Sequence, residues 1–450
     1  MTSPTAARTM EPRRVCLVTT TQPSTNPRLV KEADALAEAG FDVCAIGAYR
    51  ADWACESDAR LLASRAWRFT LIDFRREVSP ALFWKTRIRH KAAVSLSGVP
   101  LLRRVVANSA ASRVTPELAR AAREMPADLY IAHNLGALPA AAAAARLHGA
   151  RLGFDAEDFH RGEDYATEDR RRYDVICDAE RTYLPRCDYV TAASPLIADQ
   201  YVRITGGRAP VCVLNVFPLA DRPASFRPSP AGGPLRLYWF SQTIGGDRGL
   251  DDVVGAMALV RDFEIELNIR GSWQPGYRDR LLSMADAAGV RRDRIVCHEP
   301  AAPDEMVRLA SAYDVGLALE RGAGLNNDLA LSNKVFTYLL AGLAVVATRT
   351  RAQAALARDL GDAAVTYRPG AVADLADALR AWAGNRDRLA AARAAAWRLG
   401  ETTYNWDKEK EKFLGIVRSV LCGRTSPWGH ISEVTDSDTT PPVVNEETAR

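Results

Sequence analysis

The chain has 450 residues, of which 48% are hydrophobic and 25% charged, and its formal net charge is +4. That length predicts two or three domains, and the composition excludes wholesale disorder, a collagen-like repeat and a coiled coil. The small net charge does not by itself indicate a nucleic-acid-binding protein. The eight cysteines include no CxxC pair, so the sequence predicts neither a disulfide scaffold nor a structural zinc site.

The N-terminal half begins with a strand-helix-strand pattern. Residues 13–20, rich in Val and Leu, predict a buried strand, and residues 42–47 predict a second one. Between them, apolar residues recur at helical spacing from Asn26, the predicted N-cap, to Gly40, where the helix should end. Such a unit is typical of a parallel sheet covered by helices. Further strands of this half are predicted at 128–132, 151–155 and 188–193.

Five prolines and a Gly-Gly pair in residues 215–234 predict a linker. Strands are predicted beyond it at 235–240, 264–269, 294–298, 314–319, 344–348 and 363–367, and helices at 372–383, 386–399 and 404–421. We therefore expect two doubly wound parallel α/β domains, over 13–214 and 235–403, followed by a closing helix over 404–422. The ends, 1–12 and 423–450, are predicted to be disordered.

A basic stretch precedes residue 116. No Asp or Glu occurs from Ser79 to Thr115, where seven Lys and Arg residues alternate with Leu, Ile, Phe and Trp. This pattern fits contact with an anionic membrane surface or a lipid-linked acceptor. It equally fits a solvated helix pair lining a cleft between the domains, and nucleic-acid binding is the least favoured alternative.

Two segments of the C-terminal half carry candidate binding residues. In 332–342, Ser332 is expected to cap a helix whose first turn contains Lys334, where the helix dipole disfavours a cation by about 0.3–1 kcal/mol. A phosphate at that helix terminus would resolve the conflict; the alternative is an ordinary surface lysine. In 238–254, Gly245 and Gly246 precede Arg248 at a strand end, where a loop can approach a diphosphate. Neither a GxGxxG fingerprint nor a Walker loop is present.

Two segments of the N-terminal half carry further candidates. The strand at 128–132 brings His133 to the carboxyl edge of the sheet, where open α/β folds bind ligands; the alternative is a structural histidine. Asp155, Glu157 and Asp158 follow the next strand and either contact sugar hydroxyls or cap a helix. The DSD at 436–438 resembles a metal-binding DxD motif but lies in the polar tail, so we predict no metal site.

Together these segments resemble glycosyltransferase family 4, whose retaining enzymes have the GT-B fold, two Rossmann-like domains facing each other across a cleft. The resemblance covers most of 13–421 and implies an N-terminal acceptor domain and a C-terminal nucleotide-sugar domain. It also implies that the closing helix, 404–422, packs back on the first domain. The usual donor-site pair of glutamates is absent, because Thr337 and Leu329 occupy the two positions. The segment SNKVFTY resembles instead the subset of the family with an S/P-N-K-x-F-x-Y helix, and Glu320 or Asp328 is the candidate replacement for the acid.

The resemblance implies metal-independent transfer of a sugar, with retention of configuration, from a nucleoside diphosphate sugar to a hydroxyl of a glycan, a lipid-linked or a small-molecule acceptor. No cofactor and no nucleic-acid partner are expected. The residues implied as catalytic are His133, Arg248 and Lys334. Those implied in donor binding are Asn26, Gly245, Gly246, Glu320, Ser332, Asn333, Val335 and Thr337. Those implied in acceptor or sugar contact are Asp155, Glu157 and Asp158.

Two alternatives belong to other functional classes. A catalytically silent subunit that binds a partner or a membrane is favoured by Thr337 and Leu329, and a nucleotide-sugar epimerase would need acid/base carboxylates on both walls of the cleft. The first dozen residues lack the apolar core of a signal peptide, and no apolar run approaches the roughly 20 residues that cross a bilayer. We therefore expect a cytoplasmic location, with any membrane contact on the inner face.

Overall fold

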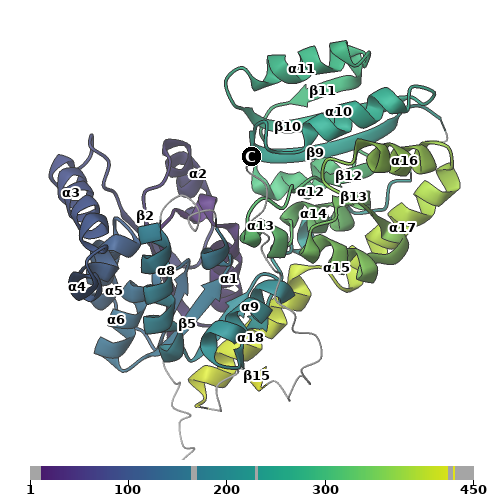
Figure 1. Ribbon diagram of the computed structural model, residues 1–450. Helices are drawn as coiled ribbons and strands as arrows, with labels where there is room; N and C mark the ends of the chain where they lie inside the picture. The colour runs from purple at the N-terminus through teal and green to yellow at the C-terminus, as the bar shows by residue number, and fades with distance from the viewer. Residues whose placement is uncertain (1–11, 164–169, 229–231, 424–428, 431–450) are drawn as a thin grey trace, which may run out of the picture.

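The computed structural model describes residues 12–163, 170–228, 232–423 and 429–430. In these residues the chain forms two α/β domains, each built on a parallel sheet with helices on both faces (Figure 1). The first sheet has seven strands in the order β3-β2-β1-β4-β5-β6-β8, and the second has six in the order β11-β10-β9-β12-β13-β14. The prediction of two doubly wound parallel sheets is confirmed.

The first domain surrounds the seven-stranded sheet. Its strands are β1 (Arg14–Thr19), β2 (Asp42–Ala48), β3 (Arg68–Ile72), β4 (Leu129–His133), β5 (Arg151–Ala156), β6 (Tyr189–Ala192) and β8 (Val211–Cys212). Its helices are α1 (Pro27–Glu38), α2 (Asp52–Leu62), α3 (Pro80–Leu96), α4 (Pro100–Ala111), α5 (Thr115–Arg123), α6 (Leu138–His148), α8 (Arg170–Tyr183) and α9 (Pro195–Thr205). A short strand, β7 (Arg208–Ala209), lies outside the sheet and pairs with β15 (Gly429–His430).

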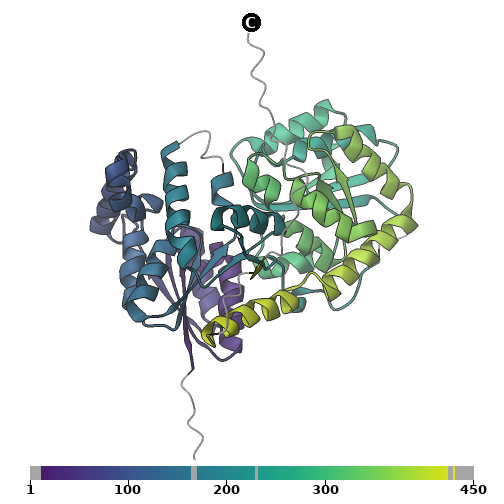
Figure 2. The same ribbon diagram turned by 60° about the horizontal axis from the view of Figure 1, so that its bottom comes forward.

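The second domain surrounds the six-stranded sheet. Its strands are β9 (Leu235–Ile244), β10 (Ile265–Trp273), β11 (Ile295–His298), β12 (Val315–Ala318), β13 (Ala344–Thr348) and β14 (Ala364–Tyr367). Its helices are α10 (Leu250–Leu259), α11 (Tyr277–Ala287), α12 (Met306–Ala310), α13 (Leu325–Leu329), α14 (Asn333–Ala341), α15 (Arg351–Leu360), α16 (Val372–Ala383) and α17 (Arg386–Thr402). The last helix, α18 (Trp406–Leu421), runs back along the first domain (Figure 2).

Every strand predicted from its apolar run is present, although β9 and β10 continue to Ile244 and Trp273. The prediction that Asn26 begins α1 is confirmed, because its side chain accepts a hydrogen bond from the Leu29 amide at 3.0 Å. The sequence analysis missed β3, whose half-buried residues at the sheet edge give no continuous apolar run. Residues 1–11, 424–428 and 431–450, for which disorder is predicted, lie outside the described residues, as does the DSD at 436–438.

One apolar core joins the two domains. It extends from Leu29 and Leu36 of α1 through Val213 and Val216 to α14 and α18. The polypeptide between the domains is fixed by polar contacts on the same side, since the Trp406 amide donates to the carbonyl of Phe217 at 2.8 Å. These contacts place the beginning of α18 against the predicted linker.

Lys31 of α1 lies at this junction. Its Nζ donates to Asn215 Oδ1 at 2.7 Å and to the carbonyl of Val216, and it lies 5.3 Å and 5.4 Å from the ring centroids of Phe217 and Trp406. A single buried ammonium group therefore connects the first domain, the linker and α18.

Helices α3 and α4 form the pair that the basic stretch predicts. They do not line a cleft between the domains, because both views place them on the side of the first domain that faces away from the second (Figures 1 and 2). That alternative for the basic stretch is wrong. Among the helices of the described residues, none has the length and apolar character needed to cross a bilayer.

Gly316 of β12 permits the close approach of α14 to the second sheet. A Cβ at this position would overlap the ring of Tyr338, which is fully buried and whose hydroxyl donates to the Leu317 carbonyl at 2.9 Å. We predict that Gly316→Ala lowers the free energy of unfolding by about 1–3 kcal/mol, the usual cost of overpacking. Urea denaturation measures this change.

Gly415 of α18 provides the control, because nothing lies within 4 Å of the position that a Cβ would take there. Gly415→Ala should raise the free energy of unfolding by about 0.5–1 kcal/mol, since alanine is the better helix former. Equal stabilities of the two variants would contradict the packing that we assign to Gly316.

Candidate functional site

The N-terminus of α14 lies beside the chain that leaves β12. Ser332 occupies the N-cap position, as predicted, but its side chain does not cap the helix; its hydroxyl instead donates to Glu320 Oε1 at 2.6 Å. Lys334 Nζ lies 2.8 Å from the same oxygen. The first amide groups of α14 therefore have no side-chain cap, and the positive end of the helix dipole is free of any such acceptor.

Glu320 is charged although only 26% of its side chain is exposed. Burial raises the pKa of Glu320, but the ammonium group of Lys334 and the hydroxyl of Ser332 together hold it below its ordinary value. Its second oxygen, Oε2, is buried and has no hydrogen-bond partner. The Lys334 side chain keeps 18% of its surface exposed, so this ion pair is partly accessible to a ligand.

The loop that follows β9 lies against the same edge. Gly249 adopts φ +75°, and a Cβ there would lie 2.9 Å from the carbonyl oxygen of Leu319, the residue before Glu320. A Cβ at Gly245 would meet the end of the Gln274 side chain, which would have to move. Arg248 is exposed between Gly245 and Gly249, with its guanidinium 3.7 Å from Asp247. The fold thus brings Arg248 and Lys334 to the same edge of the second sheet.

Other residues predicted to bind the donor have different positions. The side chain of Val335 is 1% exposed within the apolar core, so the predicted donor contact of Val335 is left to its backbone. Thr337 is fully buried and donates to the Asn333 carbonyl within α14 at 3.3 Å. Of the two candidate replacement acids, Asp328 is bonded to Arg351 of α15, whereas Glu320 lies at the helix terminus.

At the carboxyl edge of the first sheet, His133 is completely buried among acids. Its Nε2 lies 3.2 Å from Glu32 Oε2, and its Nδ1 lies 3.3 Å from Glu157 Oε1 and 3.5 Å from Asp155 Oδ2. Arg28 donates to both oxygens of Asp155, one of them at 2.8 Å. The predicted catalytic histidine and the predicted sugar-contacting Asp155 therefore belong to a buried ion network and have no exposed surface.

Contacts within this network keep His133 protonated and Asp155 ionised. Burial lowers the pKa of His133, but Glu32 above all, with Glu157 and Asp155, raises it to about 10. Burial raises the pKa of Asp155, yet Arg28 and His133 hold it below its ordinary value. The imidazolium and the guanidinium thus compensate buried carboxylates.

Sequence analysis missed Arg28 and Glu32. Their spacing of four residues places both on one face of α1, and that face is the buried one. Arg28 and Glu32 stand among the apolar positions of the amphipathic helix α1, and this pattern would have indicated a buried ion pair.

A metal ion does not fit this cluster. One ligand atom each from Glu32, His133 and Asp155 lies within 4.8 Å of the others, which is a metal-like spacing. Both oxygens of Asp155 are already hydrogen-bonded to Arg28, however, and the guanidinium beside a protonated imidazole would repel a cation.

Asp158 joins the two domains. Its Oδ1 accepts a hydrogen bond from Asn326 of α13 at 2.9 Å, and Asn326 accepts one from the Phe159 amide at 2.7 Å. Ser194 donates to the Leu329 carbonyl at 2.6 Å and extends this contact. Of the three acids predicted to meet a sugar, Glu157 alone is neither fully buried nor engaged by α13, with 29% of its side chain exposed.

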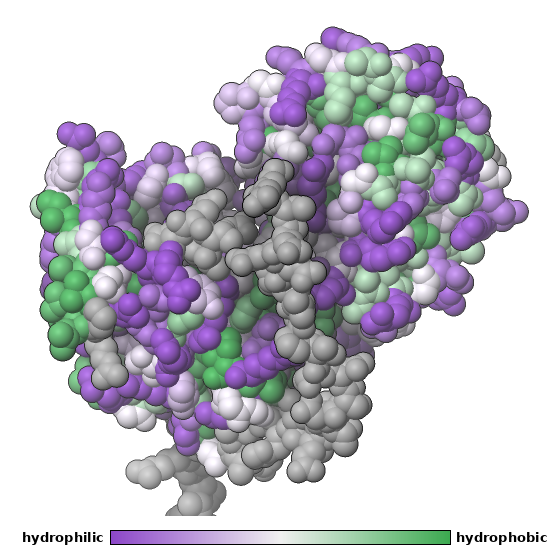
Figure 3. All heavy atoms as spheres, in the orientation of Figure 1, coloured by the Kyte–Doolittle hydropathy of each residue, from purple (hydrophilic) through white to green (hydrophobic). Residues whose placement is uncertain are grey.

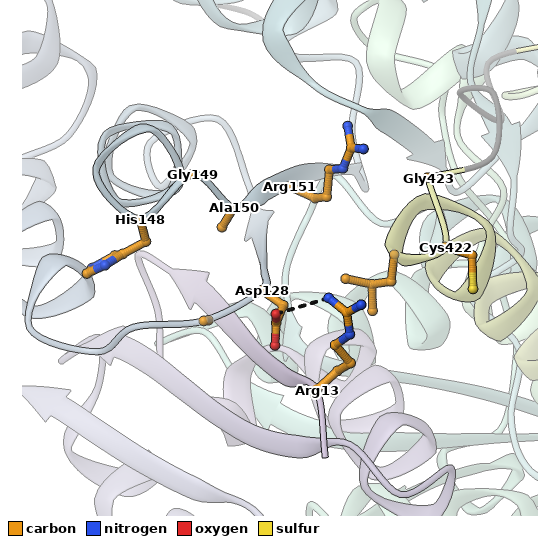
Figure 4. A pocket seen from close by; sticks show the side chains of 10 residues that line it. Arg13, Asp128, His148, Gly149, Ala150, Arg151, Cys422 and Gly423 are labelled. Atoms are coloured by element: carbon orange, nitrogen blue, oxygen red, sulfur yellow. Dashed lines mark hydrogen bonds and ion pairs between the residues drawn. The ribbon is translucent and has the colours of Figure 1, made fainter. Parts of the chain in front are cut away.

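A separate pocket of about 350 Å³ lies at the opposite edge of the first sheet (Figure 4). Arg13, Asp128 and Arg151, at or beside the starts of β1, β4 and β5, line it together with the end of α18. Arg13 is paired with Asp128 at 3.2 Å, and Arg151 with Asp188 at 2.8 Å. Parallel sheets bind ligands at their carboxyl ends, so this pocket is not the candidate site.

A family model described as glycosyl transferase-like matches residues 256–415, which include α14 but not Arg248. No curated protein sequence matches the chain. Anabaena HepE, solved in complex with UDP and with UDP-glucose, is 14% identical with a TM-score of 0.64, over 90% of this chain and 100% of HepE.

Two other solved structures are similar over 91% of this chain and 100% of their own. They are sucrose-phosphate synthase from Thermosynechococcus elongatus (13% identity, TM-score 0.61) and the N-terminal domain of Candida albicans trehalose-6-phosphate phosphatase (11% identity, TM-score 0.59). At these identities the likeness establishes the fold, which is GT-B. With the family model, it supports a glycosyltransferase family.

Two buried bases near α1 predict opposite dependences of stability on pH. The raised pKa of His133 gives stability that is present below pH 6.5 and lost as the pH rises toward 10. Burial, and then Arg28, lowers the pKa of Lys31 to about 7. Because unfolded lysine holds its proton to about pH 10.4, this effect makes the native state more stable as the pH rises from 7.

We predict that, relative to the wild type, Lys31→Met loses about 2 kcal/mol of stability between pH 7 and 9, whereas His133→Gln gains stability over the same interval. Urea denaturation of the three proteins at both pH values measures the difference. Parallel changes in both variants would contradict the charge states that we assign.

Proposed function

We propose that this protein transfers a sugar from a nucleoside diphosphate sugar to an acceptor hydroxyl. The observation that carries the proposal is the uncapped N-terminus of α14 with Lys334 beside it, at the carboxyl edge of the second sheet. This terminus lies within the residues that match the glycosyl transferase-like model. The complexes of HepE with UDP and UDP-glucose, on the same fold, favour a nucleoside diphosphate sugar as donor.

The diphosphate would bind by replacing Glu320 as the partner of Lys334. Its oxygens would accept hydrogen bonds from Lys334 Nζ and from the free amide groups of α14. Arg248, exposed on the neighbouring loop, would approach from the other side. Glu320 would then be free to accept hydrogen bonds from the hydroxyl groups of the nucleotide ribose. Thr337, at the position of the family acid, is too short and too deeply buried for this role.

The transfer follows from this charge distribution. As the anomeric carbon–oxygen bond breaks, its electron pair remains on the diphosphate, where Lys334, Arg248 and the α14 terminus stabilise it. The acceptor oxygen bonds to the anomeric carbon from the same face, and its proton passes to the departing diphosphate oxygen. The configuration is then retained, and no metal ion is required.

The first domain would hold the acceptor. Glu157 is a partly exposed acid at its carboxyl edge, and His133, which contacts it, would act as a positioning residue. Closure of the domains about 215–234 would exclude water, which otherwise hydrolyses the donor.

A catalytically silent subunit is the second candidate. It is favoured by the buried Thr337 at the position of a family acid and by the occurrence of this fold in a protein named for a phosphatase activity. An epimerase would convert the donor without any acceptor, which separates it from a transferase in one assay.

Calorimetric titration with UDP, GDP, ADP and CMP, in the absence of metal, tests the donor site. We expect one nucleoside diphosphate to bind at micromolar concentration and CMP to bind far more weakly. Failure of all four to bind would overturn the proposal and favour the silent subunit.

For the nucleotide that binds, Lys334→Ala and Arg248→Ala should each weaken binding by about 1–3 kcal/mol, the value of a charged hydrogen bond. The control is Arg368→Ala, which removes an exposed arginine paired with Asp374 at 3.1 Å in the same domain. It should leave binding unchanged. Unaltered affinity in both site variants would remove the assignment of the diphosphate to this edge.

Retention and metal independence are tested on the product. Proton NMR of the initial product should show the anomeric configuration of the donor, and excess EDTA should leave the rate of transfer within about twofold, because no metal takes part in the charge stabilisation. An inverted product, or loss of activity restored by Mg²⁺ or Mn²⁺, would contradict the mechanism.

A further inference from the structure

The helix pair α3–α4 exposes an unusual amount of apolar surface. Of the twelve large hydrophobic side chains exposed in the described residues, eight lie between 78 and 105. Leu101 is 91% exposed and Val105 80%, which is close to full exposure for residues within a helix. The eight are Val78, Trp84, Ile88, Leu96, Val99, Leu101, Leu102 and Val105.

These side chains are arranged on helix faces. In α3, Trp84 and Ile88 are four residues apart and share a face with Arg87 and Lys91, and in α4 Leu101 and Val105 are likewise four apart. The loop from Ser97 to Val99 joins the two helices, and the exposed Leu96, Val99 and Leu101 lie at or beside this turn, whereas Trp84 and Ile88 lie nearer the beginning of α3. Figure 3 shows apolar surface at the left edge of the molecule, where α3 and α4 lie.

Three cations of this surface have no acidic partner among the described residues. Arg89 is paired with Glu117, and Arg103 with Asp174 at 3.1 Å, but Lys85, Arg87 and Lys91 form no ion pair with any residue that the structure describes. All three are exposed. No acid occurs from Ser79 to Thr115, so the surface presents uncompensated positive charge together with apolar side chains.

Arg113 adds to this field. Its guanidinium lies 4.6 Å from the ring centroids of both Phe74 and Phe83, and Arg87 lies 5.9 Å from the latter ring. Burial, followed by the charge of Arg87, lowers the pKa of Arg113. Two guanidinium groups therefore share one aromatic ring at the start of α3.

We propose that the α3–α4 surface docks on an anionic lipid bilayer. Leucine, valine and tryptophan side chains enter the boundary between headgroups and acyl chains, while lysine and arginine remain with the lipid phosphates. This inference goes beyond the proposed function and does not rest on it. It places the bilayer on the side of the first domain that faces away from the second, which leaves the second domain free to move.

Charge complementarity selects a bilayer over a protein partner. Lysine is depleted from the centres of protein–protein interfaces, yet Lys91 shares the face of Trp84 and Ile88. A second copy of this chain would bring the unpaired cations Lys85, Arg87 and Lys91 of two copies together, and their repulsion disfavours such a dimer.

Flotation with vesicles of phosphatidylglycerol and phosphatidylcholine, compared with phosphatidylcholine alone, tests the proposal with the full chain. The wild type should bind the anionic vesicles, and binding should fall as salt is raised. Each cation near the surface contributes about fivefold in affinity, so Arg87→Gln with Lys91→Gln should weaken binding about 25-fold. Leu101→Ser with Val105→Ser should weaken it at least about tenfold.

Matched control variants lie on other surfaces. Arg280→Gln with Arg398→Gln removes two exposed arginines of the second domain, and Leu147→Ser with Leu259→Ser removes two leucines that are 60% and 54% exposed. Both controls should bind vesicles as the wild type does. Thermal unfolding and nucleotide titration of every variant separate a loss of fold or of the donor site from a loss of membrane binding.

The proposal is overturned if the wild type floats equally with neutral and anionic vesicles or with neither. It is also overturned if both α3–α4 variants bind as the wild type does. Gel filtration provides a further outcome against it: a dimer that Leu101→Ser with Val105→Ser dissociates, without vesicle binding, would identify the surface as a contact between copies of the chain.

Discussion

The candidate site depends on the ion pair between Lys334 and Glu320. A lysine in the first turn of a helix opposes the helix dipole, and here a carboxylate from the end of the neighbouring strand offsets that opposition at 2.8 Å. The pair exists because Gly316 lets Tyr338 pack into β12 and bring α14 against the sheet. Gly249 brings the Arg248 loop to the same place.

The Lys334–Glu320 pair is arranged so that another anion can replace Glu320 as the partner of Lys334. Ser332 donates to Glu320 instead of capping α14, so the helix terminus keeps uncapped amide donors. In the proposed function, Glu320 holds Lys334 in position until a diphosphate replaces it. A partly exposed ion pair contributes little to stability. Replacing its carboxylate by a diphosphate therefore costs the fold little.

The first domain uses charge in the opposite way. Arg28, Glu32, His133 and Asp155 are fully buried and mutually compensated, an arrangement that strongly resists the removal of one member. The network holds α1 against the ends of β4 and β5, and the neighbouring Lys31 holds α1 against the linker and α18. The same helix thus contacts both the carboxyl edge of the first sheet and the junction of the domains.

Sequence patterns predicted the features that depend on neighbouring residues in the chain, namely strands and helix ends. Apolar runs predicted the strands, and Asn26 predicted the beginning of α1. The conflict between Lys334 and its helix dipole suggested an anion site, which stays a proposal, and only the structure shows that Glu320 is the partner of Lys334. Patterns did not indicate that Asp155 binds Arg28, 127 residues away, or that Asn326 of α13 bridges to Asp158. These contacts depend on which strand ends the topology brings together, and no periodicity encodes them.

The structure of the protein with its preferred nucleoside diphosphate bound tests the central claim most directly. The account predicts diphosphate oxygens within hydrogen-bond distance of Lys334 Nζ and of the Asn333 and Lys334 amides, with Glu320 released from the lysine. A nucleotide bound elsewhere, with the Lys334–Glu320 pair intact and the α14 terminus empty, would contradict it.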